Sequence, residues 1–216
     1  MNTDFSKLKY ILMGAGGHAS VLLDLIKLRE LNIVGVCDPF LAKENIEEWK
    51  GLPVLGDDEY LNDLDPNNYL IINGIGSMPG TNRRFELQKF ITKNGFNCPT
   101  LVHPFTSISD RAEVSEKGVQ IMPGSIIQSG SKIMNNVVLN TNTSIDHDCI
   151  IHDGVNISPG VVVCGDVEIE ENVFIGCGAR IINNIKIGKN SIIGAGSLIL
   201  NDVSEGSKVI QKYAKR

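Results

Sequence analysis

The sequence lacks the features that would place the protein in a membrane, outside the cell or on nucleic acid. It has no apolar run of roughly eighteen residues, the length that spans a bilayer, and Met1–Lys9 is too polar for a signal peptide. The formal net charge is −5 and the pI is about 5.4, so a basic surface for phosphate backbones is missing. These absences predict a cytoplasmic protein without a membrane or nucleic-acid partner.

The cysteines form neither a disulfide framework nor a zinc site. They are odd in number and include no CxxC pair: Cys37, Cys98, Cys149, Cys164 and Cys177. This pattern is typical of reduced, mostly buried thiols, and we expect no bound metal. Cys149 also falls at an inward-facing position of the repeat described next, which argues against a role as a nucleophile.

The second half of the chain does contain a strict six-residue repeat. An aliphatic residue recurs at every sixth position from Ile121 to Ile199 without a miss, and a small or β-branched residue lies four positions after each. A period of six fits neither a helix nor a plain strand. It predicts a β-helix, in which short strands wind around a prism. With one extra residue between Val114 and Ile121, the repeat extends back to Val102.

The first hundred residues have a different pattern, in which short apolar segments alternate with helical ones. We predict strands at Lys9–Met13, Ile33–Cys37 and Tyr69–Asn73, and helices at Ala19–Leu31 and Asn82–Lys93. Residues 39–64 are acidic and irregular, with one further short strand within Gly51–Gly56. The alternation predicts a small parallel sheet of about three strands with right-handed crossovers.

A glycine-rich turn follows the first strand. It reads Gly14-Ala15-Gly16-Gly17-His18, and Asp38 follows the second strand. Glycines let the backbone approach a pyrophosphate at a helix N-terminus, and an acid can bind ribose hydroxyls. Because the sheet is short, the pattern favours one nucleotide diphosphate over a dinucleotide such as NAD. The alternative is that the glycines only make a tight turn and that His18 is a turn residue.

One histidine of the repeat has carboxylates on both sides. His147 lies between Asp146 and Asp148, near a corner of the predicted prism and therefore exposed. A neighbouring carboxylate orients an imidazole and raises its basicity, as a general base near neutral pH requires. His152 is followed by Asp153 but lacks a preceding acid. The alternative is that both histidines are ordinary surface residues.

Several segments together resemble those of bacterial sugar acetyltransferases that modify amino sugars on nucleotide carriers. This group includes the bacillosamine-pathway N-acetyltransferases and the related sialic-acid O-acetyltransferases. Besides the glycine turn, the matching segments are Gly74-Ile75-Gly76, Leu101–Pro104, Leu139–Thr141, Ile145–Cys149, Ile157–Gly160 and Ile193–Ser197. The resemblance implies a Rossmann-like α/β domain over residues 1–100 that binds the nucleotide sugar. A left-handed parallel β-helix over residues 101–216 would follow.

The resemblance also implies a co-substrate, an assembly and a set of site residues. Acetyl-CoA would bind between the β-helices of a homotrimer, and no metal would take part. His147 would be the base, and Asp148 would raise its basicity. The nucleotide sugar would contact Gly16, Gly17, His18, Asp38, Gly76, Asn82 and Arg84. CoA would lie along the coils near Asn156, Gly165, Cys177 and Ala195.

The chain departs from the family pattern at a few positions. Asn156 stands where many relatives have histidine, Met78–Thr81 forms a slightly longer loop, and the tail Gln211–Lys215 differs from a Gly-x-Pro-Ala-Lys type. The favoured reaction is direct acetyl transfer to the 4-amino group of a UDP-linked 4-amino-4,6-dideoxy sugar. Alternatives are O-acetylation of a sialic-acid-type sugar and N-acetylation of a GDP-linked amino sugar. From other classes, the alternatives are a nucleotide-binding regulatory module and a dinucleotide-dependent enzyme.

Overall fold

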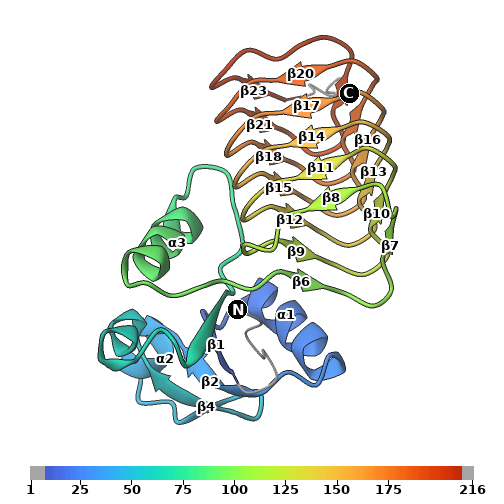
Figure 1. The fold of residues 1–216 in the computed structure, drawn as a ribbon. Helices are drawn as coiled ribbons and strands as arrows, with labels where there is room; N and C mark the ends of the chain where they lie inside the picture. The colour runs from blue at the N-terminus through green and yellow to red at the C-terminus, as the bar shows by residue number, and fades with distance from the viewer. Residues whose placement is uncertain (1–7, 211–216) are drawn as a thin grey trace. The chain divides into compact units, whose positions relative to one another are not determined.

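The computed structural model describes residues 8–210. The chain divides into two compact units between Pro99 and Thr100 (Figure 1). The first unit is an α/β sheet and the second is a parallel β-helix, as the sequence predicts. The predicted tail differences at Gln211–Lys215 lie outside the described residues.

The N-terminal unit is built on a five-stranded sheet with the order β3-β4-β2-β1-β5. Its strands are β1 (Lys9–Met13), β2 (Ile33–Cys37), β3 (Glu48–Trp49), β4 (Leu52–Gly56) and β5 (Tyr69–Asn73). The three predicted strands and the further short strand within Gly51–Gly56, which is β4, are confirmed, and the expected number of about three is too low because β3 was not predicted. β4 extends the parallel part beside β2, and β3 pairs antiparallel with β4 at the edge. A two-residue strand such as β3 is too short to show a period in the sequence.

The helices of this unit are α1 (Gly17–Leu28), α2 (Pro39–Lys43) and α3 (Arg83–Lys93), with a 3₁₀ helix, η2, at Asp58–Asp63. Residues 39–64 are thus more regular than the sequence predicts. Two aspartates begin the short helices, because Asp38 accepts amide hydrogen bonds from the first turn of α2 and Asp57 accepts one in η2. α1 ends at Leu28 rather than at the predicted Leu31.

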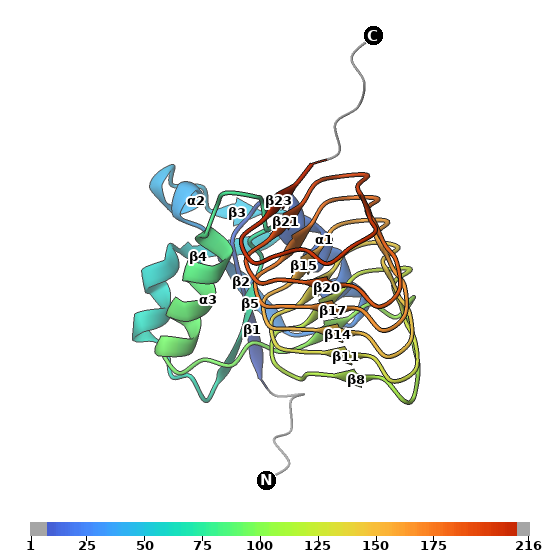
Figure 2. The same cartoon turned by 90° about the horizontal axis from the view of Figure 1, so that it is seen from above.

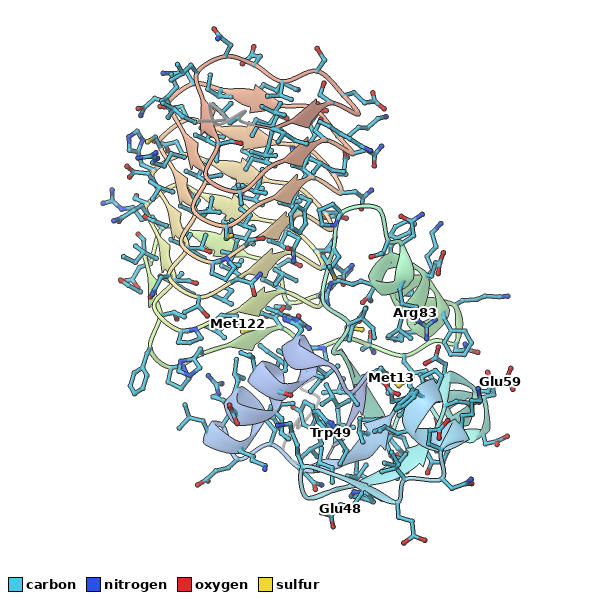
Figure 3. All side chains as sticks on the ribbon, turned by 180° about the vertical axis from the view of Figure 1, so that it is seen from behind. Met13, Glu48, Trp49, Glu59, Arg83 and Met122 are labelled. Atoms are coloured by element: carbon cyan, nitrogen blue, oxygen red, sulfur yellow. The ribbon has the colours of Figure 1, made fainter. Side chains whose placement is uncertain are left out.

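The sheet buries its central strands in an apolar core. Ile11 and Met13 of β1 and Ile71 of β5 are fully buried and pack with Leu87 and Ile91 of α3. Figure 3 shows Met13 inside this unit and Arg83 on α3. The glycine turn therefore follows a strand, β1, that is packed in the apolar core.

The β-helix has three parallel sheets, here called faces 1, 2 and 3. Face 1 contains β6 (Leu101–Val102), β9 (Gln120–Ile121), β12 (Val138–Leu139), β15 (Asn156–Ile157), β18 (Phe174–Ile175), β21 (Ile192–Ile193) and β23 (Lys208–Val209). Face 2 contains β7 (Ser107–Ile108), β10 (Ile126–Ile127), β13 (Ser144–Ile145), β16 (Val162–Val163), β19 (Arg180–Ile181) and β22 (Leu198–Ile199). Face 3 contains β8 (Glu113–Val114), β11 (Lys132–Ile133), β14 (Ile150–Ile151), β17 (Glu168–Ile169) and β20 (Lys186–Ile187).

Each coil stacks on the next with its equivalent residues in register. Ile127 pairs with Ile145, and Ile145 pairs with Val163, one coil of eighteen residues further along each time. Figure 2 shows the successive coils from above. The aliphatic residue that ends each strand points inward, and these residues form one continuous core. The coils before Ile121 join this core through Val102, Ile108 and Val114.

The corners between faces have a second repeat, which the sequence analysis did not use. The third residue after each inward aliphatic from Ile121 to Ile193 has a positive φ, and it is always Gly, Asn or Asp: Gly124, Gly130, Asn136, Asn142, Asp148, Gly154, Gly160, Asp166, Asn172, Gly178, Asn184, Asn190 and Gly196. These residue types adopt the left-handed conformation at the lowest cost. The corner backbone therefore dictates which residues are allowed there.

None of the helices within residues 8–210 combines the length and the apolar character needed to cross a bilayer.

Candidate functional site

His147 lies at the corner between faces 2 and 3, directly after β13. Its Nδ1 is 3.0 Å from Oδ2 of Asp148 and 3.9 Å from Oδ2 of Asp166, one coil further on. The backbone amide of His147 donates to Oδ1 of Asp146 at 2.8 Å. Its side chain is 49% exposed, so one edge of the ring remains open to a substrate. The structure thus brings together the two predicted catalytic residues.

The carboxylates around His147 raise its pKa. The largest cause is the hydrogen bond to Asp148, which outweighs the lowering by desolvation, and the charges of Asp146 and Asp166 act in the same direction. In the neutral ring, Nδ1–H donates a hydrogen bond to the Asp148 carboxylate. The lone pair of the ring is then on Nε2. Sequence reasoning missed Asp166, which is recognisable only when eighteen residues are counted as one coil.

Asp148 has two roles that the structure separates. Its φ of +58° belongs to the corner repeat, where Gly, Asn or Asp serves equally well. Its carboxylate is the largest cause of the raised pKa of His147, a contribution that an uncharged Asn or Gly at this corner would not make. The backbone conformation thus explains why a small polar residue lies at this corner. The contact with the imidazole of His147 explains why that residue is an acid.

Cys149 faces the interior of the prism, as its place in the repeat predicts. It is fully buried, and its Sγ donates to the carbonyl of Cys164 at 3.1 Å. Burial raises the pKa of this thiol to about 11, so at neutral pH it is not a thiolate. An acyl-enzyme on Cys149 is therefore disfavoured.

His152 occupies the corner between faces 3 and 1. Its Nε2 lies 3.0 Å from Oε1 of Glu168, whose other oxygen is 3.2 Å from Nζ of Lys186. Sequence reasoning missed Glu168, which lies on the neighbouring coil. His152 and His147 therefore occupy different corners of the prism and cannot act on one reacting atom within a single chain.

The structure places the four residues predicted to contact CoA in three locations. Cys177 and Ala195 lie one coil apart at the corner between faces 1 and 2, and Cys177 is exposed. Asn156 lies on face 1 and is 6% exposed. Gly165 lies at the corner between faces 2 and 3, next to His147. Face 2 thus separates the Cys177 corner from the His147 corner.

The glycine turn of the N-terminal unit contains glycines of two kinds. Gly14 has a φ of +96°, its amide donates to the carbonyl of Cys37 at 2.7 Å, and an added Cβ would overlap the side chain of Ile75. Gly16 and Gly17 have ordinary φ values, and a Cβ at either would meet nothing within 4 Å in the part of the chain that the structure describes. The tight-turn explanation therefore accounts for Gly14 but not for the other two glycines.

Gly16 and Gly17 also mark the start of α1. Gly16 is the N-cap, and among the described residues no side-chain hydrogen bond caps this end of the helix. A helix N-terminus carries partial positive charge and amide donors that suit an anion. The local geometry thus leaves both space and donors at the predicted phosphate position.

Asp38 joins the glycine turn to α2. Its Oδ2 accepts from the amide of Ala15 at 2.9 Å, and its Oδ1 accepts from Phe40 and Leu41 at 2.9 and 3.1 Å. The carboxylate therefore has a structural role in shaping the turn, which the sequence analysis did not foresee.

The remaining predicted contacts lie near the end of β5. Arg84 donates from Nη1 to the carbonyls of Asn73 and Ile75, at 3.0 and 2.7 Å, and burial lowers its pKa to about 10, so it remains charged at neutral pH. Gly76 lies so close to His18 that an added Cβ would be 3.3 Å from the Cβ of His18. Asn82 is exposed at the start of α3.

Asn73 is a residue of this region that sequence reasoning missed. It is buried, it accepts from the amide of Ile75 at 3.2 Å, and its side-chain amide donates to the carbonyl of Arg84 at 3.0 Å. A polar residue at the end of a buried strand was the available signal. Together with Arg84, it fixes the backbone of the Gly74–Gly76 segment.

Comparison with known proteins places both units in described families. Residues 9–85 match the PglD N-terminal domain, and residues 166–201 match the bacterial transferase hexapeptide with its six repeats. The acetyltransferase domain of PglB from Neisseria gonorrhoeae FA1090, solved with acetyl coenzyme A, is 31% identical. That match covers 93% of this chain and 94% of that chain, with a TM-score of 0.82.

Two further solved structures are similar over nearly the whole chain. PerB from Caulobacter crescentus, in complex with CoA and GDP-perosamine, is 28% identical over 93% of this chain and 92% of that chain, with a TM-score of 0.82. WeeI from Acinetobacter baumannii AYE is 22% identical over 94% and 97%, with a TM-score of 0.81, and shows the shared fold. With the PglB match, these findings show that the chain belongs to the sugar acetyltransferases of the left-handed β-helix, or hexapeptide-repeat, superfamily.

Proposed function

We propose that the protein transfers the acetyl group of acetyl-CoA to the 4-amino group of a UDP-linked 4-amino-4,6-dideoxy sugar, with His147 as general base. The observation that carries this proposal is the His147–Asp148 pair on an exposed corner of the β-helix. The PglB structure was solved with acetyl coenzyme A, and the PerB structure with CoA and GDP-perosamine. The choice of UDP as carrier follows the resemblance to the bacillosamine-pathway N-acetyltransferases.

The reaction proceeds as a direct transfer within a ternary complex. The amine nitrogen attacks the thioester carbonyl carbon while Nε2 of His147 takes a proton from the amine. A C–N bond forms, the C–S bond breaks, and CoA leaves as the thiolate. A backbone N–H stabilises the oxyanion that forms on the carbonyl oxygen. Asp148 holds the ring through Nδ1 and stabilises the imidazolium that results.

The nucleotide part of the substrate would bind at the start of α1. Gly16 and Gly17 leave space there that no packing among residues 8–210 requires, and the amides at the helix start suit a pyrophosphate. His18 and Gly76 line the adjacent segment. Asp38 acts at this site chiefly by shaping the turn, and Arg84 by fixing the carbonyls of Asn73 and Ile75.

The separation of two corners supports an active site between copies of the chain. The CoA-contacting candidates Cys177 and Ala195 lie on the corner across face 2 from His147. One β-helix cannot bring both corners to one acetyl group, so a neighbouring copy must supply one of them. We propose a homotrimer in which the His147 corner of one protomer faces the Cys177 corner of another.

A GDP-linked amino sugar is the second candidate, because PerB is similar over nearly the whole chain and was solved with GDP-perosamine. A panel of UDP- and GDP-linked 4-amino sugars, with a sialic-acid-type sugar as an O-acetylation acceptor, tests all three substrates. Thiol release gives the rate and mass spectrometry identifies the acetylated product. Turnover with the UDP-linked sugar is expected to be fastest.

The catalytic assignment is tested with His147→Ala. Removing a general base is expected to lower kcat by about two to four powers of ten. His152→Ala is the matched control, because this histidine also pairs with a carboxylate but occupies another corner. Full activity of His147→Ala would show that the base is another group. The absence of acetyl-CoA consumption with every sugar of the panel would favour a nucleotide-binding module instead.

A further inference from the structure

Gly165 lies one coil beyond His147 at the same corner of the β-helix. It is buried, although the corner residues on either side of it, Cys164 and Asp166, are at least partly accessible. A Cβ built on Gly165 would overlap the imidazole of His147, with Cε1, Nε2 and Nδ1 as its nearest neighbours. The ring of His147 therefore lies directly against the backbone of Gly165.

The backbone conformation does not explain a glycine here. The corner glycines with positive φ, such as Gly130 and Gly160, lie at the third position after an inward aliphatic, whereas Gly165 lies at the second and has an ordinary φ. The equivalent second positions hold many residue types: Pro123, Ser129, Asn135, Thr141, His147, Asp153, Pro159, Glu171, Cys177, Asn183, Lys189, Ala195 and Asn201. Gly165 is the sole glycine among these positions.

We propose that Gly165 is a positioning residue for His147, and that its missing side chain leaves the niche in which the ring meets Asp148. This inference rests on the proposed role of His147 as the base. The ring lies between the niche and the solvent, with Nδ1 3.0 Å from Asp148. A methyl group in the niche would turn the ring, lengthen the Nδ1–Oδ2 hydrogen bond and redirect Nε2 away from the incoming amine.

The steric part of the proposal is tested by a double-mutant cycle that needs no activity. Gly165→Ala is expected to lower the melting temperature, because the methyl group overlaps the His147 ring. In a His147→Ala background the same substitution is expected to have little effect, since the ring is gone. An equal loss of stability in both backgrounds would overturn the proposal, because the methyl group would then clash with something other than the ring.

The electrostatic part is tested by following the imidazole of His147 by NMR. If Gly165→Ala separates Nδ1 from Asp148, the pKa of His147 falls toward its ordinary value. Asn183→Ala is the matched control, because Asn183 holds the same corner position one coil further on. An unchanged His147 pKa in Gly165→Ala would contradict the proposal.

Kinetics then connect the niche to the reaction. Gly165→Ala is expected to lower kcat by about 10- to 100-fold through misplacement of the base, with little change in KM for the nucleotide sugar. The acid limb of the pH profile should move to lower pH together with the pKa of His147. If no sugar is acetylated by the wild-type protein, the proposed function fails, while the stability cycle and the NMR titration still decide the role of Gly165.

Discussion

His147 and Asp148 form their side-chain hydrogen bond between adjacent residues, with Nδ1 and Oδ2 3.0 Å apart. Asp148 makes this contact while it occupies a left-handed corner with a φ of +58°. Asp148→Asn keeps a residue suited to this corner and removes the charge. The pair therefore permits a test of the carboxylate that leaves the backbone conformation unchanged.

We predict that Asp148→Asn shifts the pH profile of kcat/KM. A general base acts in its neutral form, so activity is lost as pH falls through the pKa of His147. The carboxylate raises that pKa. In Asp148→Asn the acid limb should therefore move to lower pH while the maximal rate falls, because the imidazolium is less stabilised. An acid limb at the wild-type position would show that Asp148 does not set the pKa of the base.

The same pair makes a pH-dependent contribution to stability. Because folding raises the pKa of His147, protonated His147 stabilises the fold at pH values below its unfolded pKa. This contribution is lost as pH rises through the folded pKa. Denaturant unfolding should show a larger stability difference between wild type and His147→Asn at pH 5 than at pH 8. A difference independent of pH would mean that the fold does not favour the charged ring.

The thiols offer a chemical test of the CoA corner. Cys177 is exposed, whereas burial raises the pKa of Cys149 to about 11 and that of Cys37 to about 12. Iodoacetamide should modify Cys177 in the native protein and reach the other two only after unfolding. Because Cys177 is a proposed CoA contact, saturating CoA should slow its alkylation. Mass spectrometry of the labelled peptides measures both effects, and an unprotected Cys177 would remove it from the proposed CoA site.

The sequence was most informative where a period is long and strict. The inward aliphatics from Ile121 to Ile199 fixed the strands of the β-helix, because a miss at any of them would leave a gap in a continuous core. The left-handed corners were not predicted, although Gly, Asn or Asp recurs there at every sixth residue. Contacts between coils were also missed. Asp166 lies beside His147 and Glu168 beside His152 although each is on the next coil, so neither carboxylate is a neighbour of its histidine in the sequence.

The N-terminal unit was less predictable because its elements are short. β3 has two residues and α2 has five, which is too few for either to show a hydrophobic period. The role of Asp38 was also hidden, because its carboxylate reaches back twenty-three residues to the amide of Ala15. Asp38, which the motif predicts to contact the nucleotide, has a structural role in supporting the glycine turn.

Substitution of Asp38 should therefore affect substrate binding through the shape of the turn. Asp38→Ala removes the hydrogen bond to Ala15 and the cap of α2, at a cost of about 0.5–2 kcal/mol from the cap alone. KM for the nucleotide sugar should rise, while the His147 site in the β-helix stays intact and KM for acetyl-CoA changes little. Steady-state kinetics with each substrate varied in turn separate these effects. A rise confined to KM for acetyl-CoA would contradict this view of the turn.

The corner repeat predicts a stability effect far from the chemistry. Asn172 has a φ of +56° at the corner between faces 3 and 1, and its Oδ1 lies over Gly154 of the preceding coil. Asn172→Ala should cost about 1–2 kcal/mol, because alanine lacks the short polar side chain that offsets the strain of a β-carbon in the left-handed region, whereas Asn172→Gly removes the β-carbon and should cost much less. Denaturant unfolding of both variants measures the difference, and kcat of the folded proteins should be unchanged. Equal losses in the two variants would mean that the side chain of Asn172, rather than its backbone conformation, stabilises the corner.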